Sequence, residues 1–343
     1  MRGGKAGNDV TGGDVTGSKR TDEPGPARAG TGIGPGLAAI RTAREIASDA
    51  GHPDFEGRPV VALHAPVEPR VPFVFNSPHS GDDYPSGFRR VSRLDAATLR
   101  RSEDVGVHAL FGGVVRLGAP LLEARFPRAW LDVNREPYEL DPRMFSGTVP
   151  AHANVRSVRV AGGLGTIPRL VAEGRDIYRS RIPVAEALER VERVYKPYHA
   201  ALRTLLDGAQ AAFGRAILID CHSMPSAAGD TAERPDMVVG DRFGTAAARA
   251  LSDLAVDTLR DLGYRVSRNK PYAGGFITEH YGRPSRGHHA IQIEINRGLY
   301  LHEPSYGFTE GFPALADDLF RFVETLMARA EVVLDGPMRM AAE

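Results

Sequence analysis

The chain of 343 residues is poor in cysteine and aromatic residues and has no excess of charge of either sign. Its single cysteine, Cys221, excludes an intramolecular disulfide framework and is typical of a reducing compartment, so we expect a cytoplasmic location. Lys and Arg together number 43, as do Asp and Glu, so no overall basic field attracts nucleic acid or an anionic membrane. No run approaches the roughly 20 apolar residues of a membrane span, and MRGGKAGNDVTGG at the N-terminus lacks the apolar region of a secretory signal.

What is present is the composition of a soluble globular protein, with 42% hydrophobic and 25% charged residues. Such a chain is an enzyme or a small-molecule binder, with no nucleic-acid or membrane partner expected. Residues 1–35 contain almost no large apolar side chains and cannot offset their ordering entropy by burial, so we predict a disordered tail. We expect residues 36–343 to form a single domain. The composition leaves the oligomeric state open.

From residue 71 onward, apolar runs of strand length alternate with segments of helical period. The predicted strands are 60–63, 71–75, 114–117, 129–133, 216–220, 236–239 and 290–295. The predicted helices are 37–50, 188–213 with a kink at Pro197, 251–262 closed by Gly263, and 315–330. This alternation predicts an α/β fold, a three-layer α/β/α sandwich with a mixed, mostly parallel central sheet. In such folds ligands bind beyond the carboxyl ends of the strands.

Polar residues stand at four of the predicted strand ends. His79 follows the first of these strands in a Pro- and Gly-containing turn, and by itself it could be an ordinary turn residue. Asp220 and His222 end the central strand, and Asn134-Arg135 follow residues 129–133. In HHAIQIEINRGLY, Glu294 lies in mid-strand on a polar face, opposite a face formed by isoleucines.

Two chemistries could use this set of residues. In the first, His79, His222 and a carboxylate bind zinc and leave one position open for water, with Glu294 as general base and Arg135 holding an anion or stabilising developing charge. In the second, Cys221 or Ser223 is a nucleophile. Neighbouring residues on a strand point to opposite faces, so Cys221 would lie away from His222, and no Gly-x-Ser-x-Gly elbow is present. We favour the metal.

The third ligand of such a site comes from RSEDVGVHALF, which predicts the start of a helix. Glu103 and Asp104 would lie in its first turn, where carboxylates also compensate the helix dipole. Either acid could bind the metal, and we select Asp104.

Six motifs in this order, SPHSG, SED, LDVNREP, DCHSMP, GGFITEHYGRP and HHAIQIEINR, resemble the N-formylglutamate amidohydrolase (deformylase) family. The resemblance extends roughly from residue 71 to residue 322. It implies a phosphorylase/hydrolase-like fold related to the zinc carboxypeptidases, with one zinc ion per chain. Carried over, the ligands are His79, Asp104 and His222, the base is Glu294, and Asn134 and Arg135 lie near the substrate.

The remaining candidates are placed by the same motifs. The glycines of GGFITEHYGRP let backbone approach a ligand closely, so this segment is predicted to face the substrate with His280 and Arg283, although it could also be a charged surface loop. His289 precedes Glu294 on its strand and could orient a ligand or the base.

The predicted function is zinc-dependent hydrolysis of a small anionic N-acyl amino acid. By the resemblance, this substrate is N-formyl-L-glutamate, which would give formate and glutamate. One alternative is a carboxypeptidase-like or other N-acyl amino acid hydrolase on the same site. A second alternative is a non-catalytic protein that retains the metal site, although such a protein would have no need of a buried Glu294.

Overall fold

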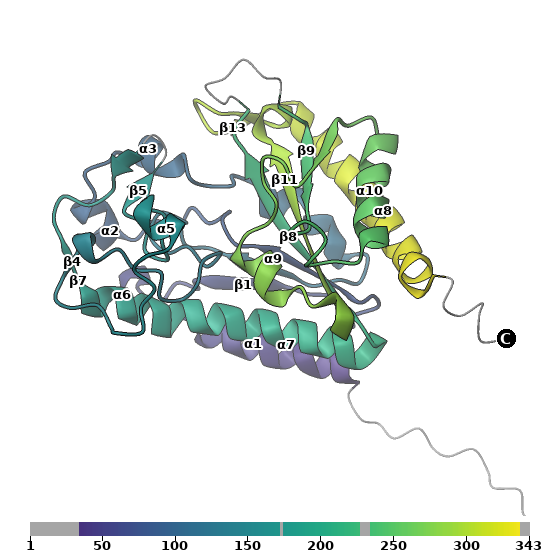
Figure 1. The fold of residues 1–343 in the computed structure, drawn as a ribbon, viewed down its shortest axis with the longest axis horizontal. Helices are drawn as coiled ribbons and strands as arrows, with labels where there is room; N and C mark the ends of the chain where they lie inside the picture. Colours follow the sequence, from purple (N-terminus) through teal and green to yellow (C-terminus); the bar gives the residue numbers. More distant parts are fainter. Residues whose placement is uncertain (1–33, 172–173, 227–233, 337–343) are drawn as a thin grey trace, which may run out of the picture. The chain divides into compact units, whose positions relative to one another are not determined.

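A seven-stranded sheet runs through the centre of the described chain (Figure 1). The structure is a computed structural model that describes residues 34–171, 174–226 and 234–336. The strands, in spatial order, are β1 (Val61–His64), β3 (Leu121–Ala124), β2 (Phe73–Ser77), β8 (Ala216–Met224), β11 (His288–Asn296), β9 (Met237–Gly240) and β10 (Val266–Arg268). The β1–β3 and β11–β9 pairs are antiparallel, and the other four neighbouring pairs are parallel. The predicted mixed, mostly parallel sheet is confirmed.

Helices cover both faces of this sheet. The helices of eight or more residues are α1 (Pro35–Asp49), α7 (Lys196–Phe213), α8 (Arg249–Asp261) and α10 (Gly311–Asp335). On one face α1 and α7 lie side by side and share a core with Val74 and Leu218 of the sheet (Figure 1). On the other face α8 and α10 pack against Phe75, Ile219 and Ile291. The three-layer architecture is therefore confirmed, together with the helices predicted at 37–50, 251–262 and 315–330.

The predicted break near Pro197 is a π-helical turn. Helix α6 (Val184–Arg190) continues through π-turn η5 (Val191–Tyr195) into α7. Proline has no N–H to donate to the preceding turn, which favours an irregularity at this point.

Two predicted strands are wrong. Residues 114–117 fall on the end of the 3-10 helix η2 (Gly112–Val115) and on the turn that follows it, where Gly112 and Gly113 favour a tight turn over an extended chain. Residues 129–133 begin in a turn in which the N–H groups of Trp130 and Leu131 both donate to the Pro127 carbonyl, at 2.9 and 3.3 Å. Their apolar side chains are buried in the helix-covered core and not in a sheet. Strands β3 and β10 were not predicted.

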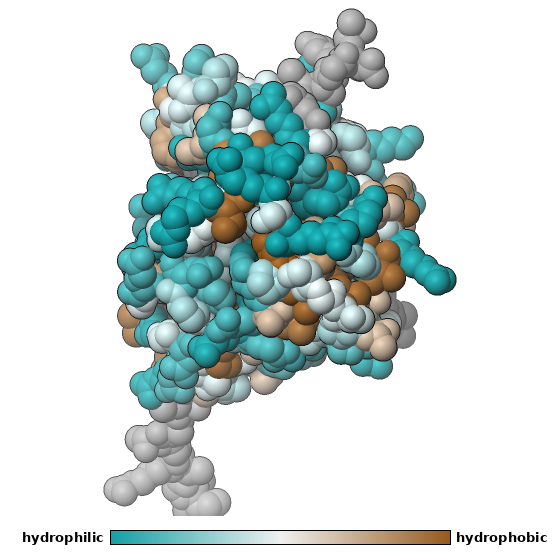
Figure 2. Space-filling view, turned by 90° about the vertical axis from the view of Figure 1, so that its left-hand side faces the viewer, coloured by the Kyte–Doolittle hydropathy of each residue, from teal (hydrophilic) through white to brown (hydrophobic). Residues whose placement is uncertain are grey.

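Short elements make up the rest of the described chain. The short helices are η1 (Pro53–Phe55), α2 (Ser86–Val91), α3 (Ala96–Arg100), α4 (Val107–Leu110), η3 (Pro142–Met144), α5 (Val158–Ala161), α9 (Phe276–Tyr281), η6 (Pro284–Arg286) and η7 (Arg297–Leu299). The two-residue strands are β4 (Phe145–Ser146), β5 (Leu170–Val171), β6 (Arg175–Asp176), β7 (Ile182–Pro183), β12 (Leu301–His302) and β13 (Gly307–Phe308). Figure 2 looks onto the side of the molecule that carries α2, α3 and α5, where hydrophilic residues predominate.

Two expectations from the sequence concern the chain as a whole. Among the described residues, no helix is both long and apolar enough to span a bilayer. Residues 1–33, which hold nearly all of the predicted disordered tail, lie outside the described residues, and α1 begins at Pro35. The division into a tail and a domain stays a prediction.

Candidate active site

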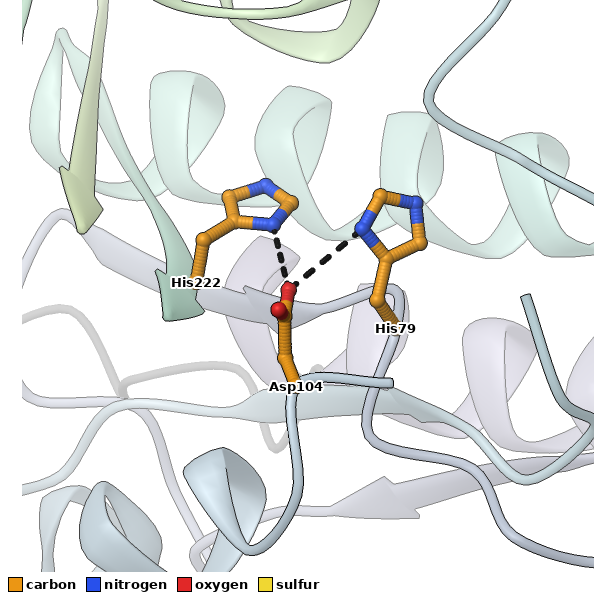
Figure 3. A group of neighbouring side chains, drawn as sticks. All are labelled: His79, Asp104 and His222. Atoms are coloured by element: carbon orange, nitrogen blue, oxygen red, sulfur yellow. Dashed lines mark hydrogen bonds and ion pairs between the residues drawn. The ribbon is translucent and has the colours of Figure 1, made fainter. Parts of the chain in front are cut away.

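His79, Asp104 and His222 form a buried cluster at the carboxyl end of the central strands (Figure 3). The Nδ1 atoms of His222 and His79 lie 2.9 and 3.4 Å from the same oxygen, Oδ2 of Asp104. One ligand atom from each residue lies within 4.8 Å of the others. The three side chains belong to segments far apart in sequence, and together they could hold a metal ion.

The parallel pairing of β2 and β8 brings these segments together. Asn76 lies opposite Asp220 in the register, so His79 follows β2 beside the end of β8, where His222 lies. The backbone N–H of Asp104 donates to the carbonyl of His79 at 2.9 Å, which fixes the third segment. Gly81 lets the turn after His79 pass against residues 125 and 126, because a Cβ here would lie 2.3 Å from the carbonyl carbon of Arg125.

The two nitrogens of His79 have different environments. Nε2 lies 2.8 Å from Oδ1 of Asp132, and since a carboxylate accepts, Nε2 carries the proton. Nδ1 is buried and makes no hydrogen bond with any described residue. A neutral imidazole of this tautomer presents the Nδ1 lone pair to the cluster, as a metal ligand must. The residues therefore fit a metal ion.

His222 is oriented by a second buried carboxylate. Its Nε2 lies 3.1 Å from Oδ2 of Asp220 and 3.2 Å from Nδ2 of Asn134. Asn76 and Thr278 donate to Asp220 at 2.8 and 3.4 Å. Burial alone would lower the pKa of His222, but Asp220 and Asp104 raise it well above its usual value. These contacts direct Nδ1 of His222 toward Asp104.

The two acids at 103 and 104 point to different places. Oδ1 of Asp104 accepts from Ser223 and from Arg297, both at 3.1 Å, which turns Oδ2 toward the histidines. Burial opposes ionisation, but His222 and His79 outweigh it and hold the pKa of Asp104 well below its usual range. The Glu103 carboxylate accepts instead from Tyr84 and from Arg100, at 2.5 and 2.9 Å. Asp104, and not Glu103, therefore belongs to the cluster, in a turn before α4 and not in a helical first turn.

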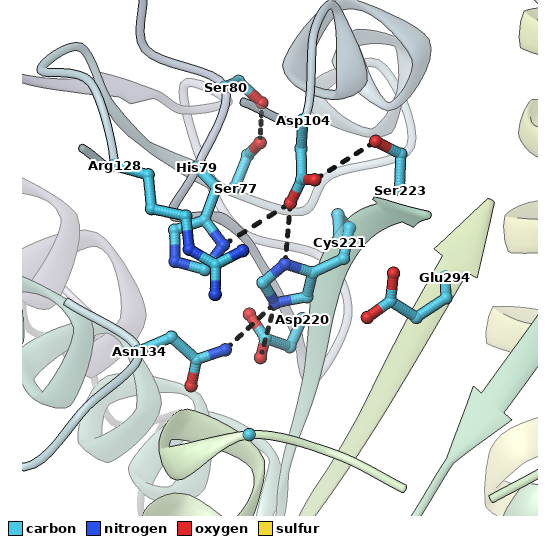
Figure 4. A network of polar contacts seen from close by, with 12 residues as sticks. Ser77, His79, Ser80, Asp104, Arg128, Asn134, Asp220, Cys221, Ser223 and Glu294 are labelled. Carbon is cyan, nitrogen blue, oxygen red and sulfur yellow. Dashed lines mark hydrogen bonds and ion pairs between the residues drawn. The ribbon is translucent and has the colours of Figure 1, made fainter. Parts of the chain in front are cut away.

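Glu294 lies beside His222 on the neighbouring strand, directly opposite it in the β8–β11 register. Its carboxylate is on the polar side of β11 and points toward the His222 side of the site (Figure 4). Gln292 donates to its Oε1 at 2.8 Å. Burial raises the pKa of Glu294 to about 7, with Asp104 adding to this effect and His222 opposing it. A carboxylate with a pKa near neutrality is suited to accept and then return a proton.

Asn134 and Arg135 lie on the other side of the cluster. The Asn134 amide is held through its Oδ1, which accepts from the Ile277 N–H at 2.8 Å, and its Nδ2 lies 3.2 Å from Nε2 of His222. The Arg135 guanidinium donates to the carbonyls of Leu164 and Asn134, at 2.8 and 2.7 Å, and lies 3.3 Å from Asp132. These contacts use three of its five donors. Burial lowers the pKa of Arg135 to about 10, so it remains a cation at neutral pH.

Arg128 is a further site cation, which the sequence analysis missed. Its Nε donates to Oδ2 of Asp132 at 2.9 Å, and its guanidinium interacts electrostatically with Asp104 and Glu294 (Figure 4). Burial opposes ionisation, but the surrounding carboxylates raise the pKa of Arg128. The only signal for Arg128 in the sequence is its position four residues before Asp132. This spacing brings the two side chains together only because the chain turns at Pro127.

Comparison with known proteins identifies the family. The family model described as N-formylglutamate amidohydrolase matches residues 71–301. The chain belongs to the N-formylglutamate amidohydrolase family.

Its relatives agree with this assignment. The N-formylglutamate deformylases of Pseudomonas putida and Pseudomonas aeruginosa are 27% and 29% identical over 68% of this chain and 83% and 84% of their own lengths. The crystal structure of N-formylglutamate amidohydrolase from Ralstonia eutropha JMP134 matches with a TM-score of 0.74 and 36% identity, over 79% of this chain and 98% of that one. The protein is thus a hydrolase that acts on a linear amide.

Three of the candidate substrate residues of this amidohydrolase lie away from the cluster. His289 is at the start of β11, five residues before Glu294, and its Nδ1 accepts from the Ala248 N–H at 3.2 Å. His280 stacks on Phe276 and accepts from Arg203 at 3.0 Å. Arg283 is exposed, and its guanidinium donates to the carbonyls of Glu279 and Gly282. The structure brings none of the three to the cluster, because His289 lies at the amino end of β11, opposite Ile217 of β8, and His280 and Arg283 contact Arg203, Glu279 and Gly282 instead.

The alternative nucleophile, Cys221, lies on the face of β8 opposite Asp220 and His222. It is fully buried among apolar residues beneath α8 and α10. Burial raises the pKa of the Cys221 thiol well above its usual value. A protonated thiol that lies away from the cluster cannot attack a substrate there.

Proposed function

We propose that this amidohydrolase hydrolyses N-formyl-L-glutamate to formate and glutamate at a single zinc ion bound by His79, Asp104 and His222. The observation that carries the proposal is the buried Nδ1 of His79, which has no hydrogen-bond partner among the described residues and faces Asp104 and His222. The names of the Pseudomonas and Ralstonia relatives support the choice of substrate.

Two imidazoles and one carboxylate are a donor set typical of catalytic zinc, which keeps a further position open. The bound ion would polarise the formyl carbonyl and lower the pKa of water. Asp132 and Asp220 would hold the two imidazoles in the tautomers and orientations that binding requires.

Glu294 is the proposed general base and acid. It takes one proton from the attacking water as the water oxygen bonds to the formyl carbon. It then gives that proton to the amide nitrogen as the carbon–nitrogen bond breaks, so formate and the free amino group of glutamate leave. The pKa of about 7 that burial gives Glu294 is suited to both transfers.

Arg135 and Arg128 are proposed to divide the anionic groups of the substrate between them. Two N–H donors of Arg135 have no partner among the described residues, which is enough for a bidentate contact with a substrate carboxylate. Arg128 is tied to Asp132 only through Nε, so its terminal nitrogens can face the oxygen that becomes negative during attack. Asn134 fixes the relation of this segment to His222.

The experiment is steady-state kinetics on N-formyl-L-glutamate and on the neutral N-formyl-L-glutamine. The wild-type enzyme is expected to prefer the former. In Arg135→Ala the KM for N-formyl-L-glutamate should rise with kcat largely kept, because the contact exists in both ground and transition states. In Arg128→Ala kcat should fall for both substrates. Arg143→Ala is the matched control, since Arg143 pairs with Asp141 outside the site.

Two results would contradict these assignments. If KM in Arg135→Ala rises equally for N-formyl-L-glutamate and N-formyl-L-glutamine, Arg135 does not bind the substrate carboxylate. A wild-type enzyme that prefers N-acetyl amino acids or peptides to both formyl substrates would replace the proposed substrate by another N-acyl amino acid on the same site.

A further inference from the structure

Residues 130–135 have no regular secondary structure, yet they carry Asp132, Asn134 and Arg135 into the site. Buried carbonyls in such a segment need hydrogen-bond partners from elsewhere in the chain. Three of them receive donors from a single run of helix, α6 through α7. Arg190 Nη1 donates to the carbonyl of Trp130 at 2.9 Å.

The other two donors bind the carbonyls of the residues before and after Asn134. The Tyr195 hydroxyl donates to the carbonyl of Arg135 at 2.6 Å, and Nε2 of His199 lies 2.8 Å from the carbonyl of Val133. All four atoms belong to buried residues. The peptide group before Asn134 and the peptide group after Arg135 are therefore held from the same helix.

The hydrogen bonds of His199 determine its tautomer. A carbonyl can only accept, so Nε2 carries the proton and Nδ1 accepts from the Tyr281 hydroxyl at 2.9 Å. Burial lowers the pKa of His199 to about 3, so the ring stays neutral at working pH. Tyr281 is the last residue of α9, the helix whose N-terminal backbone contacts the Asn134 amide. His199 thus joins α7, the 133–135 segment and α9.

The spacing of Tyr195 and His199 explains how one helix presents both donors. Tyr195 is the last residue of the π-turn, and His199 lies one turn later, so both side chains lie on the same side. A π-turn inserts one residue into a helix, which rotates the residues that follow it relative to those before it, and such turns occur often at functional sites.

We propose that Tyr195 and His199 are positioning residues for substrate binding, which set the placement of Asn134 and Arg135 through the carbonyls of Val133 and Arg135. Neither side chain touches the metal cluster among the contacts described. The proposal rests on the proposed function, because it assigns the substrate carboxylate to Arg135.

The test compares Tyr195→Phe, His199→Phe and His199→Gln with wild type in steady-state kinetics on N-formyl-L-glutamate. Tyr195→Phe removes only a hydroxyl, and Gln can present an amide N–H near the former position of Nε2. We expect KM to rise about tenfold in Tyr195→Phe and in His199→Phe, with kcat within about twofold and metal content unchanged. His199→Gln should recover part of the lost affinity. The control is Tyr264→Phe, which removes a tyrosine hydroxyl bonded to Asp318 outside the site and should leave KM unchanged.

The outcomes separate the two proposals. A wild-type enzyme that turns over N-formyl-L-glutamate while Tyr195→Phe keeps its KM overturns this inference alone. An equal rise in KM in His199→Gln and His199→Phe also overturns the inference, since it indicates a general structural role. Loss of metal in Tyr195→Phe overturns it for the same reason. Absence of turnover in the wild type overturns the proposed function and, with it, the inference. If His199→Phe does not fold, Tyr195→Phe still decides between these outcomes.

Discussion

The two faces of strands β8 and β11 are both buried but have opposite chemistry. One face carries Ile219, Cys221 and Ile293, packed beneath α8 and α10. The other face carries His222 and Glu294, whose polar atoms meet the carboxylates, amides and arginines of the site. These five residues alternate between the two faces of the same strands and are each exposed by no more than 8%.

This difference shows how one pair of strands can serve both stability and catalysis. The apolar face contributes buried area, which changes little with small, shape-conserving substitutions. On the polar face the side chains of Asp220, His222 and Glu294 have polar partners, so the loss of one group leaves another unpaired. We therefore expect substitutions on the polar face to change activity or metal affinity, and those on the apolar face to change stability alone.

The largest expected effect on a rate comes from Glu294→Gln. The substitution is nearly isosteric and removes only the ability to accept a proton, so kcat should fall by about 10²- to 10⁴-fold while zinc content and KM stay close to wild type. Ile293→Val, one residue away on the apolar face, is the control and should keep full kcat. A fully active Glu294→Gln enzyme would show that the base lies elsewhere.

Asp132→Asn should weaken metal binding. Asp132 accepts from His79 and fixes the tautomer that presents Nδ1, so metal affinity should fall by about 10- to 100-fold, measured by competition with a chelator. The matched control is Asp141→Asn, since Asp141 is equally buried and paired with arginines but lies outside the site. Equal metal affinities in Asp132→Asn and wild type would show that Asp132 is not needed to orient His79 for metal binding.

Gly275→Ala should reduce activity moderately. A Cβ at this position would lie 2.4 Å from Nδ2 of Asn134, and the Asn134 amide cannot move freely because its Oδ1 accepts from the Ile277 N–H. We expect kcat/KM to fall about tenfold, in the range expected when a positioned group is displaced by less than 1 Å. Gly112→Ala has open space around its Cβ and serves as the control. If both variants behave like wild type, Asn134 does not need its observed position.

The smallest effect on activity is expected for Cys221→Ser. The hydroxyl would be buried among apolar side chains, so the free energy of unfolding should fall by about 1 to 3 kcal/mol while metal content and kcat are kept. Chemical denaturation and kinetics on the same preparation would measure both. Loss of turnover in Cys221→Ser, with His79→Ala still active, would instead support a nucleophilic cysteine.

The length and spacing of apolar runs decided which strands could be predicted from the sequence. Strands β8 and β11 were predicted because their apolar residues fall at strand spacing over a long enough run. Strand β3 was missed because it is four residues long and contains Glu123. Residues 129–133 were assigned wrongly because burial in a loop and burial in a strand give the same short apolar run. The turn that distinguishes them, with hydrogen bonds to the Pro127 carbonyl, is not visible in that run.

In the site, the structure brings together the predicted residues His79, His222 and Glu294, whereas it places His280, Arg283 and His289 away from the cluster. His79, His222 and Glu294 come together because parallel strands end at one edge of the sheet, and Asp104 joins them because its backbone N–H donates to the carbonyl of His79. His289 is near Glu294 in sequence, but five residues along an extended strand separate them by roughly 16 Å. The contributions of Arg128, Tyr195 and His199 depend on side chains that reach across the fold, which no local pattern reports.

The most direct test of the account is the metal content of the purified protein and its histidine variants. Zinc measured by atomic emission should be close to one per chain in the wild type and in Cys221→Ser, and should fall to near zero in His79→Ala and His222→Ala, with turnover lost in parallel. Chelation should inactivate the wild type, and added zinc should restore it. Full turnover in a chelated, zinc-free enzyme, or zinc retained by both histidine variants, would contradict the proposed site.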